Sequence, residues 1–454
     1  MSTPTPGERL GGTATDTPRT ASVGFGPAPL DAAALLSLYL WAVGGWFVLS
    51  IPLSFVQREL GAVRSRQILL NAVFFLALLG LALRQRVFPA LPRARVPPGA
   101  RSLLLLGSSL SFLACQLCKL QSFTTNGVDF SIFDWMLEST LRGRFMYSPI
   151  YDVNHFDIHP SYLMLLLVPL HTLFRTPMLL TVLNGALLWL GVFPAERLAR
   201  QLTGSAAYGA LAAVLYLTNP WTARMLDGGF RPEVAYPLFG LLFAVGWVEA
   251  RPRRWAAGAL GLLCGKEDAG FYLAALALGA LFFKRPRRRE AIALLAAAVA
   301  VTRLDLGLVQ PWCLRGHARA QPEYLHFWGQ YGNTLGEIVR HMVRAPWRVV
   351  ADVASSGWLK LFAPALLLPL LSPVPLCAML PAVVLLGSSS YSMMRSYLTY
   401  YPIPLVPFFL WGLFAAYPRL ARLPFRDALF TAVRWPSRLS GLATRNTIGR
   451  ASIC

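Results

Sequence analysis

Acidic and histidine side chains gather in one short part of an otherwise apolar chain, between residues 122 and 160. This part holds five of the 21 Asp and Glu residues and two of the six His residues. A carboxylate inside the hydrocarbon of a bilayer costs about 2.5 to 3.5 kcal/mol on insertion scales. Carboxylates can accept a hydroxyl proton, and histidines can exchange protons or bind a metal. The cluster therefore predicts chemistry at a membrane surface.

Two aspartates near the start of this part are candidate catalytic residues. Asp129 and Asp134 lie five positions apart, so on one helix they would not share a face, and each needs its own role. We predict that Asp129 is the general base, because it comes soonest after an apolar run. The alternatives are that Asp129 caps the helix that follows it, and that Asp134 pairs with an arginine for structural reasons.

A candidate metal site follows in the same part of the chain. His155, Asp157 and His159 have the i, i+2, i+4 spacing with which side chains can bind a divalent metal. The alternative is that the two histidines only form hydrogen bonds. A divalent metal is the only candidate cofactor, because the chain has no Walker loop, dinucleotide fingerprint or HExxH motif.

Three further polar groups are candidates for substrate binding. Cations can neutralise a phosphate, and carboxylates can hold or deprotonate a hydroxyl group. The Lys-Glu-Asp triplet could instead form internal ion pairs, and the last arginine could extend toward the membrane interface. The predicted substrate-binding residues are Asp227, Arg231 and Glu233; Lys266, Glu267 and Asp268; and Arg395.

Composition indicates which elements must position these side chains. The 454-residue chain is 55% hydrophobic and only 14% charged, with a mean hydropathy of +0.50. These values exclude an ordinary soluble domain, and unbroken Leu, Ala, Phe and Val runs favour helices over a β-barrel. We predict an all-α bundle of about twelve spans, at 32–54, 67–83, 102–121, 177–196, 205–218, 234–249, 255–266, 268–283, 290–303, 357–372, 374–389 and 397–416. Residues 161–174 are predicted to form a short juxtamembrane or re-entrant helix.

The positive charges predict an orientation for this bundle. The formal net charge of +21 comes from arginines in short loops and at the C-terminus, which is typical of topology determinants and not of a nucleic-acid-binding surface. The positive-inside rule places these clusters and both termini in the cytoplasm, with loops 122–176, 219–233 and 304–356 outside. Residues 255–283 then form a hairpin with Lys266, Glu267 and Asp268 at its outer apex.

Four regions follow from this reading. Residues 1–30 are predicted to be a disordered tail, 31–101 an N-terminal hairpin with a basic loop, 102–416 the main transmembrane domain, and 417–454 a basic tail. The polar groups of the main domain would all lie on the outer side of the plasma (inner) membrane. A pocket at the outer leaflet that combines carboxylates and cations suits a sugar or a phosphate headgroup.

Several segments in a fixed order resemble the membrane-protein family catalogued as domain of unknown function 2079. They are VDFSIFDWMLESTLRGR, NHFDIHPSYLMLLLVPLHTLF, GGFRPEV, CGKEDAGFYLAALALG and YLTYYPIPLVPFFLWG, and the resemblance covers roughly residues 105 to 416. That family is distantly similar to the C-type integral membrane glycosyltransferases. The chain departs from the family where it has Arg231, Thr399 and Tyr400 in place of histidines.

The resemblance implies an integral membrane glycosyltransferase of fold C. Such an enzyme would move a sugar from a polyprenyl-phosphate donor to a hydroxyl group on a glycan, lipid or protein acceptor, with membrane lipid as its surroundings and without nucleic acid. Asp129 matches the usual base, Asp227 or Glu233 an assisting acid, and Lys266, Arg231 and Arg395 would stabilise the departing phosphate. The alternatives are a transporter or flippase of a lipid-linked or polar solute, and a non-catalytic membrane assembly protein.

Overall fold

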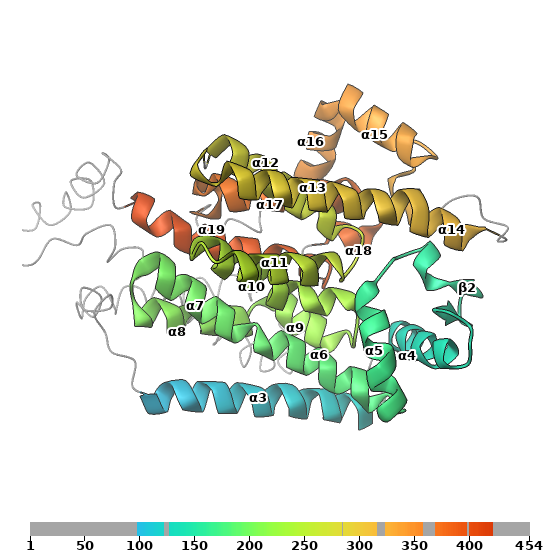
Figure 1. Ribbon diagram of the computed structural model, residues 1–454, viewed down its shortest axis with the longest axis horizontal. Helices are drawn as coiled ribbons and strands as arrows, with labels where there is room; N and C mark the ends of the chain where they lie inside the picture. The colour runs from blue at the N-terminus through green and yellow to red at the C-terminus, as the bar shows by residue number, and fades with distance from the viewer. Residues whose placement is uncertain are drawn as a thin grey trace, which may run out of the picture.

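The chain folds into a bundle of helices with almost no strands (Figure 1). The computed structural model describes residues 98–121, 127–283, 285–315, 323–356, 368–396 and 399–420. Within these residues, strands occur only as β1 (Tyr147–Ser148) and β2 (Val153–Asn154), which pair antiparallel. The predicted all-α class is therefore confirmed for this part of the chain.

Three stretches of helix are long and apolar enough to cross a membrane: Arg101–Gln121, Met178–Thr203 and Arg288–Leu314. The first lies in α3 (Pro98–Gln121), and the second joins α6 (Met178–Leu190) to α7 (Val192–Thr203). The third runs from α13 (Arg288–Leu304) through the π-helical turn η5 (Asp305–Val309) into α14 (Gln310–Leu314). Each exceeds the ~20 residues that a bilayer core requires.

Other apolar helices are shorter than this length. They are α5 (Tyr162–Leu173), α8 (Ala206–Leu217), α10 (Ala235–Val248), α12 (Ala269–Phe283), α17 (Pro373–Ser388) and α19 (Leu405–Leu420). The helix predicted at 161–174 corresponds to α5. The predicted spans 32–54 and 67–83, both predicted tails, and most of 357–372 lie outside the described residues.

The bundle has two chemically different ends. At one end lie the start of α3, the end of α7, the start of α11 (Pro252–Leu263), the start of α13 and the end of α19 (Figure 1). These termini carry the arginine clusters of the sequence, so we call this the basic end. At the opposite end lie α4 (Gly127–Leu141), α5, the two strands and α14 (Figure 1).

The two arms of the predicted hairpin at 255–283 are α11 and α12, and each packs mainly against another helix. α11 packs along α10, while α12 packs against α13 and α17. Glycines allow these close approaches: a Cβ atom at Gly258 would clash with the Phe243 backbone, and one at Gly270 would clash with Thr302. Small residues serve the same purpose at helix interfaces in membranes generally.

Short elements complete the described chain. Buried apolar side chains form one large cluster through the bundle and a small second cluster beneath α15 (Leu335–Arg344) and α16 (Pro346–Ser355). Asn219 caps α9 (Pro220–Asp227), where its side chain accepts hydrogen bonds from two backbone N–H groups. The remaining elements are η2 (His155–Asp157), η3 (Pro232–Val234), η4 (Arg285–Arg287), η6 (Glu323–Trp328), η8 (Leu368–Leu371) and α18 (Ser392–Arg395).

Candidate functional site

A buried ion pair lies at the turn between α11 and α12. Lys266 Nζ lies 3.0 Å from Glu233 Oε1, and the two side chains are only 16% and 15% exposed. Glu233 belongs to η3, 33 positions earlier in the chain. Burial lowers the pKa of Lys266, but Glu233, Glu267 and Asp268 outweigh burial and hold that pKa well above its ordinary value. Lys266 is therefore a fixed cation among three carboxyl groups.

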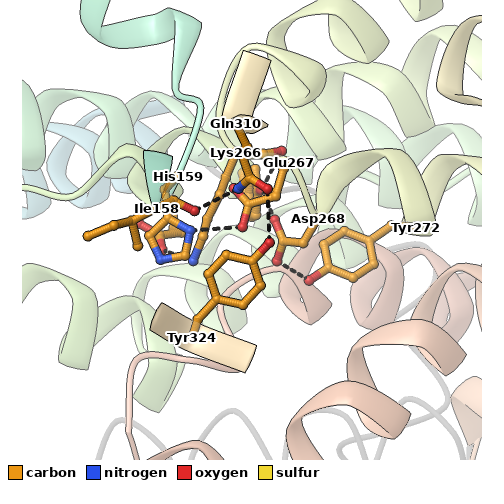
Figure 2. A network of polar contacts seen from close by, with 10 residues as sticks. Ile158, His159, Lys266, Glu267, Asp268, Tyr272, Gln310 and Tyr324 are labelled. Carbon is orange, nitrogen blue, oxygen red and sulfur yellow. Dashed lines mark hydrogen bonds and ion pairs between the residues drawn. The ribbon is translucent and has the colours of Figure 1, made fainter. Parts of the chain in front are cut away.

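Glu267, the next residue of the turn, contacts His159, which lies near the end of the acidic part of the sequence between residues 122 and 160. His159 Nδ1 lies 2.8 Å from Glu267 Oε1, and the Glu267 side chain is 8% exposed (Figure 2). Burial lowers the pKa of His159 to about 3 and raises the pKa of Glu267 to about 7. Near neutral pH the pair therefore consists of a neutral imidazole and a carboxyl group that can hold a proton, and the donor at this contact is whichever of the two carries the hydrogen.

The third residue of the turn is held by two tyrosines. The hydroxyl groups of Tyr236 and Tyr272 each donate a hydrogen bond to one carboxylate oxygen of Asp268. Figure 2 shows the contact with Tyr272, which lies one helical turn after Asp268 in α12. Burial raises the pKa of Asp268. We call Glu233, Lys266, Glu267, Asp268 and His159 the polar cluster.

A second layer of hydrogen bonds holds His159 in place. The Tyr324 ring stacks on the His159 ring, with centroids 5.4 Å apart and an interplanar angle of 14°. The Tyr324 hydroxyl donates to Gln310 Oε1 at 3.1 Å, and Gln310 Nε2 donates to the Ile158 carbonyl at 2.8 Å (Figure 2). Gln310 is the first residue of α14, so the π-helical turn before it sets the position of this layer.

An arginine lies beside the polar cluster in the sequence. Arg231 is buried, its guanidinium carbon lies 3.9 Å from the centroid of the Tyr400 ring, and Nη1 donates to the Gly228 carbonyl at 3.0 Å. A cation over an aromatic face is attracted by the ring quadrupole. Tyr400 in turn stacks on Tyr401, with centroids 4.4 Å apart. Arg231 therefore packs against a pair of stacked tyrosine rings.

Two predicted substrate-binding residues have other partners. Asp227 is half exposed and forms an ion pair with Lys119 of α3, and Arg224 lies 3.9 Å away. Arg395 donates to Ser355 Oγ at 2.6 Å and to the Asp352 carbonyl at 3.3 Å, both on α16. Neither residue shares a hydrogen bond or ion pair with the polar cluster among the contacts of the described residues.

The predicted catalytic aspartates lie on one helix, α4. Asp129 is in its first turn, and its side chain lies outside the described residues. Burial raises the pKa of Asp134, and the neighbouring His171 opposes this effect. His171 Nε2 lies 3.6 Å from Glu138 Oε2, on the same helix as Asp134. The groups that act on Asp134 are therefore His171 and Glu138, and not an arginine.

The predicted metal ligands do not gather around one point. Among the described residues, no group of three or more His, Cys, Asp or Glu side chains is arranged to hold a metal ion. His155 and His159 meet ring to ring, with centroids 5.9 Å apart, and His159 turns toward Glu267. Burial lowers the pKa of His155 to about 3, so this ring is neutral as well. His155 thus takes part in ring packing, and His159 takes part in ring packing and in the contact with Glu267.

Four side chains of the site were not predicted from the sequence. Tyr272 follows Asp268 at i+4, the spacing at which side chains meet on one helix face, so it could have been found. Gln310 is a polar residue inside a long apolar helix, which is also a signal. Tyr236 gave no such signal, and Tyr324 lies in an aromatic-rich segment that could either stack on a sugar ring or form an interface belt, which is common near a membrane interface.

Comparison with known proteins places the chain among membrane proteins. Residues 119–437, more than half of the chain, match a family model described as "Predicted membrane protein (DUF2079)". No curated protein and no solved structure matches the chain.

Proposed function

We propose that this chain, which belongs to the DUF2079 family of predicted membrane proteins, is an integral membrane glycosyltransferase. It would move a sugar from a polyprenyl-phosphate donor to a hydroxyl group on a glycan, lipid or protein. The proposed architecture is a fold C-like bundle of about twelve spans in the plasma membrane, with cytoplasmic termini and the polar cluster facing outside. The orientation follows from the arginine clusters at the basic end.

One observation carries this proposal: residues from three distant segments meet in one buried cluster. Lys266 contacts Glu233 at 3.0 Å, and Glu267 contacts His159 at 2.8 Å. Burying several ionisable groups together in a membrane protein is costly and is typical of functional sites. A cation and acids side by side suit a substrate that carries both phosphate and hydroxyl groups.

The proposed reaction is a single displacement at the anomeric carbon of the donor sugar. The acceptor oxygen forms a bond to this carbon while the bond from the carbon to the phosphate oxygen breaks, and the lipid phosphate leaves with the electron pair. The acceptor proton passes to a carboxylate, for which Asp129 is the proposed base. Lys266 and Arg231 are the proposed cations for the charge that develops on the phosphate.

The proposal can be tested with purified protein and a panel of radiolabelled polyprenyl-phosphate monosaccharides, with total membrane lipid from the host as acceptor. We expect transfer of label by the wild type and at least a hundredfold loss in Asp129→Asn and Glu233→Gln. Glu249→Gln, which changes a buried carboxylate at the basic end, is the matched control and should retain activity. Absence of transfer from every donor by folded wild type would refute the proposal.

The transporter alternative is favoured by one feature of α13 to α14. Asp305 is buried within the candidate span Arg288–Leu314, and the Tyr162 hydroxyl donates to its Oδ1 at 2.5 Å. Ionisable residues inside spans often mark a path for an ion or solute. Movement of a polyprenyl-phosphate sugar across proteoliposomes without sugar transfer, lost in Asp305→Asn, would support this alternative.

A further inference from the structure

Helices α15 and α16 project sideways from the bundle next to α17 (Figure 1). They expose a large apolar surface that no other part of the described chain covers. Val343 is 74% exposed, Trp347 66% and Val350 66%, and Leu335 and Val339 are exposed as well. In a membrane protein such a surface faces either lipid or a protein partner.

The spacing of these residues gives each helix a coherent apolar stripe. In α15, Leu335, Val339 and Val343 recur at i, i+4 and i+8, and therefore follow one face. In α16, Trp347 and Val350 are separated by three positions and share a face in the same way. A neighbouring flank of α15 packs onto the protein through Ile338, and α16 packs onto it through Val349.

The acidic side chains of the two helices accept hydrogen bonds within the chain, whereas the basic side chains are exposed. Glu337 is used in a capping box with Thr334, and its Oε2 accepts the Asn333 N–H at 2.9 Å. Asp352 accepts a hydrogen bond from the Tyr331 hydroxyl at 2.5 Å. Both acids thus take part in hydrogen bonds within the described chain, although Glu337 itself is exposed. The three arginines of these helices are all exposed: Arg340, Arg344 and Arg348.

Exposed apolar stripes flanked by arginines match the chemistry of an anionic membrane surface. On a helical wheel, Arg340 and Arg344 border the stripe of α15, one turn apart. An interfacial helix inserts its apolar face among the acyl chains, while its basic side chains contact lipid phosphates. Trp347 suits the same depth, because tryptophan prefers the headgroup region.

We propose that α15 and α16 lie in the membrane interface and bind anionic lipid headgroups through Arg340, Arg344 and Arg348. The small cluster of Leu325, Tyr331, Ile338 and Val349 holds the two helices on the bundle. The Arg395 hydrogen bond to Ser355 joins α16 to α18, so the lipid-binding helices are tied to the segment that leads to Tyr400. This inference does not depend on the chemistry at the polar cluster.

The insertion is tested by comparing two positions on α15 in the full chain, with its six native cysteines replaced by serine. Val343→Cys and His341→Cys each receive an environment-sensitive fluorophore, and the protein is reconstituted into vesicles of phosphatidylcholine and phosphatidylglycerol. His341 is exposed on the polar side of the same helix, which makes it the matched control. We expect lipids brominated in their acyl chains to quench the label at position 343 several-fold more than the label at 341.

The selectivity of the two helices for anionic lipid is tested by substituting their three arginines. Each basic side chain near an anionic surface contributes about fivefold to binding, so the triple variant R340Q/R344Q/R348Q should retain much less phosphatidylglycerol in native mass spectrometry. The triple lysine variant keeps the charge and should retain phosphatidylglycerol, which shows that a loss is not due to misfolding. Equal quenching at 343 and 341, or disulfide cross-linking of V343C to a second copy without quenching, would overturn the proposal.

Discussion

The basic end and the polar cluster both pair carboxylates with cations, but in opposite proportions. At the basic end, the single carboxylate of Glu249 has three arginine partners. They are Arg197 at 2.5 Å, Arg251 at 3.6 Å and Arg254 in direct contact. The arginines are 30% to 64% exposed, although the Glu249 side chain is only 7% exposed. Water and anionic lipid can therefore reach the positive charges.

The polar cluster has one lysine for three carboxyl groups, and all of these side chains are withdrawn from solvent. Since Lys266 can neutralise only one carboxylate, the cluster must lower its charge in another way. It does so by raising the pKa of Glu267 to about 7 and by using two tyrosine hydroxyls as donors to Asp268. An excess of exposed cations suits orientation in a membrane, whereas an excess of buried acids suits proton chemistry.

The largest effect on stability is expected when the cation is removed from the polar cluster. Lys266→Met leaves Glu233 buried without its partner, which should lower the free energy of unfolding by about 3 to 5 kcal/mol. The measurement is the thermal midpoint of the purified protein in detergent. The double variant K266M/E233Q removes both charges and should recover most of the loss. An unchanged midpoint in K266M would mean that Glu233 is as well solvated as a surface group.

A second test uses pH and the variant Glu267→Gln. The pKa of Glu267 is raised from its ordinary value of 4.5 to about 7, so its contribution to stability is complete below pH 4.5 and is lost as pH rises through 7. Relative to the wild type, the variant should therefore lose stability as pH falls from about 7 to 4.5, by at most ~1.4 kcal/mol per pH unit.

The readout of the pH test is the difference in unfolding midpoint between variant and wild type across this range. The pKa values of His155 and His159 are both lowered to about 3, so these rings cost stability as pH falls below 6.5 in both proteins. That cost cancels in the difference unless the His159 contact itself changes. A difference that stays constant from pH 4.5 to 7 would contradict a proton held by Glu267.

The smallest effect is expected at the basic end. Glu249→Gln weakens ion pairs whose arginines remain in contact with water, and such pairs are worth about 1 kcal/mol or less. Its unfolding midpoint should shift little, and added salt should reduce the shift further because exposed charges are screened. A loss of stability as large as that of K266M would show that the ion pairs of the basic end stabilise the fold as much as the polar cluster does.

The sequence predicted the class of fold and the position of the key turn. Long Leu- and Ala-rich runs predicted helices, and α3, α6 with α7, and α13 with α14 confirm this at the length a membrane requires. Lys266, Glu267 and Asp268 were expected between two helices, which is where they lie. Which neighbours the two arms of this hairpin contact could not be read from the sequence, because close approaches at glycines bring α11 onto α10 and α12 onto α13.

Sequence spacing could not decide which acid meets which cation. Asp227 and Glu233 are six positions apart and equally acidic, yet only Glu233 contacts Lys266, while Asp227 pairs with Lys119. The reason is that α9 ends at Asp227 and the chain then turns through Gly228 and Gly229 before η3 begins. A positive φ of 81° at Gly229 marks this change of direction.

Hydropathy and arginine distribution alone determined that this chain is a helical membrane protein with one basic end. Those properties depend on composition and on local runs of residues, which no packing can change. Tertiary structure alone decided that Glu233, Lys266, Glu267 and His159 form one buried cluster. His159 and Glu267 are 108 positions apart, and contacts over that separation depend on how closely helix backbones approach at their glycines.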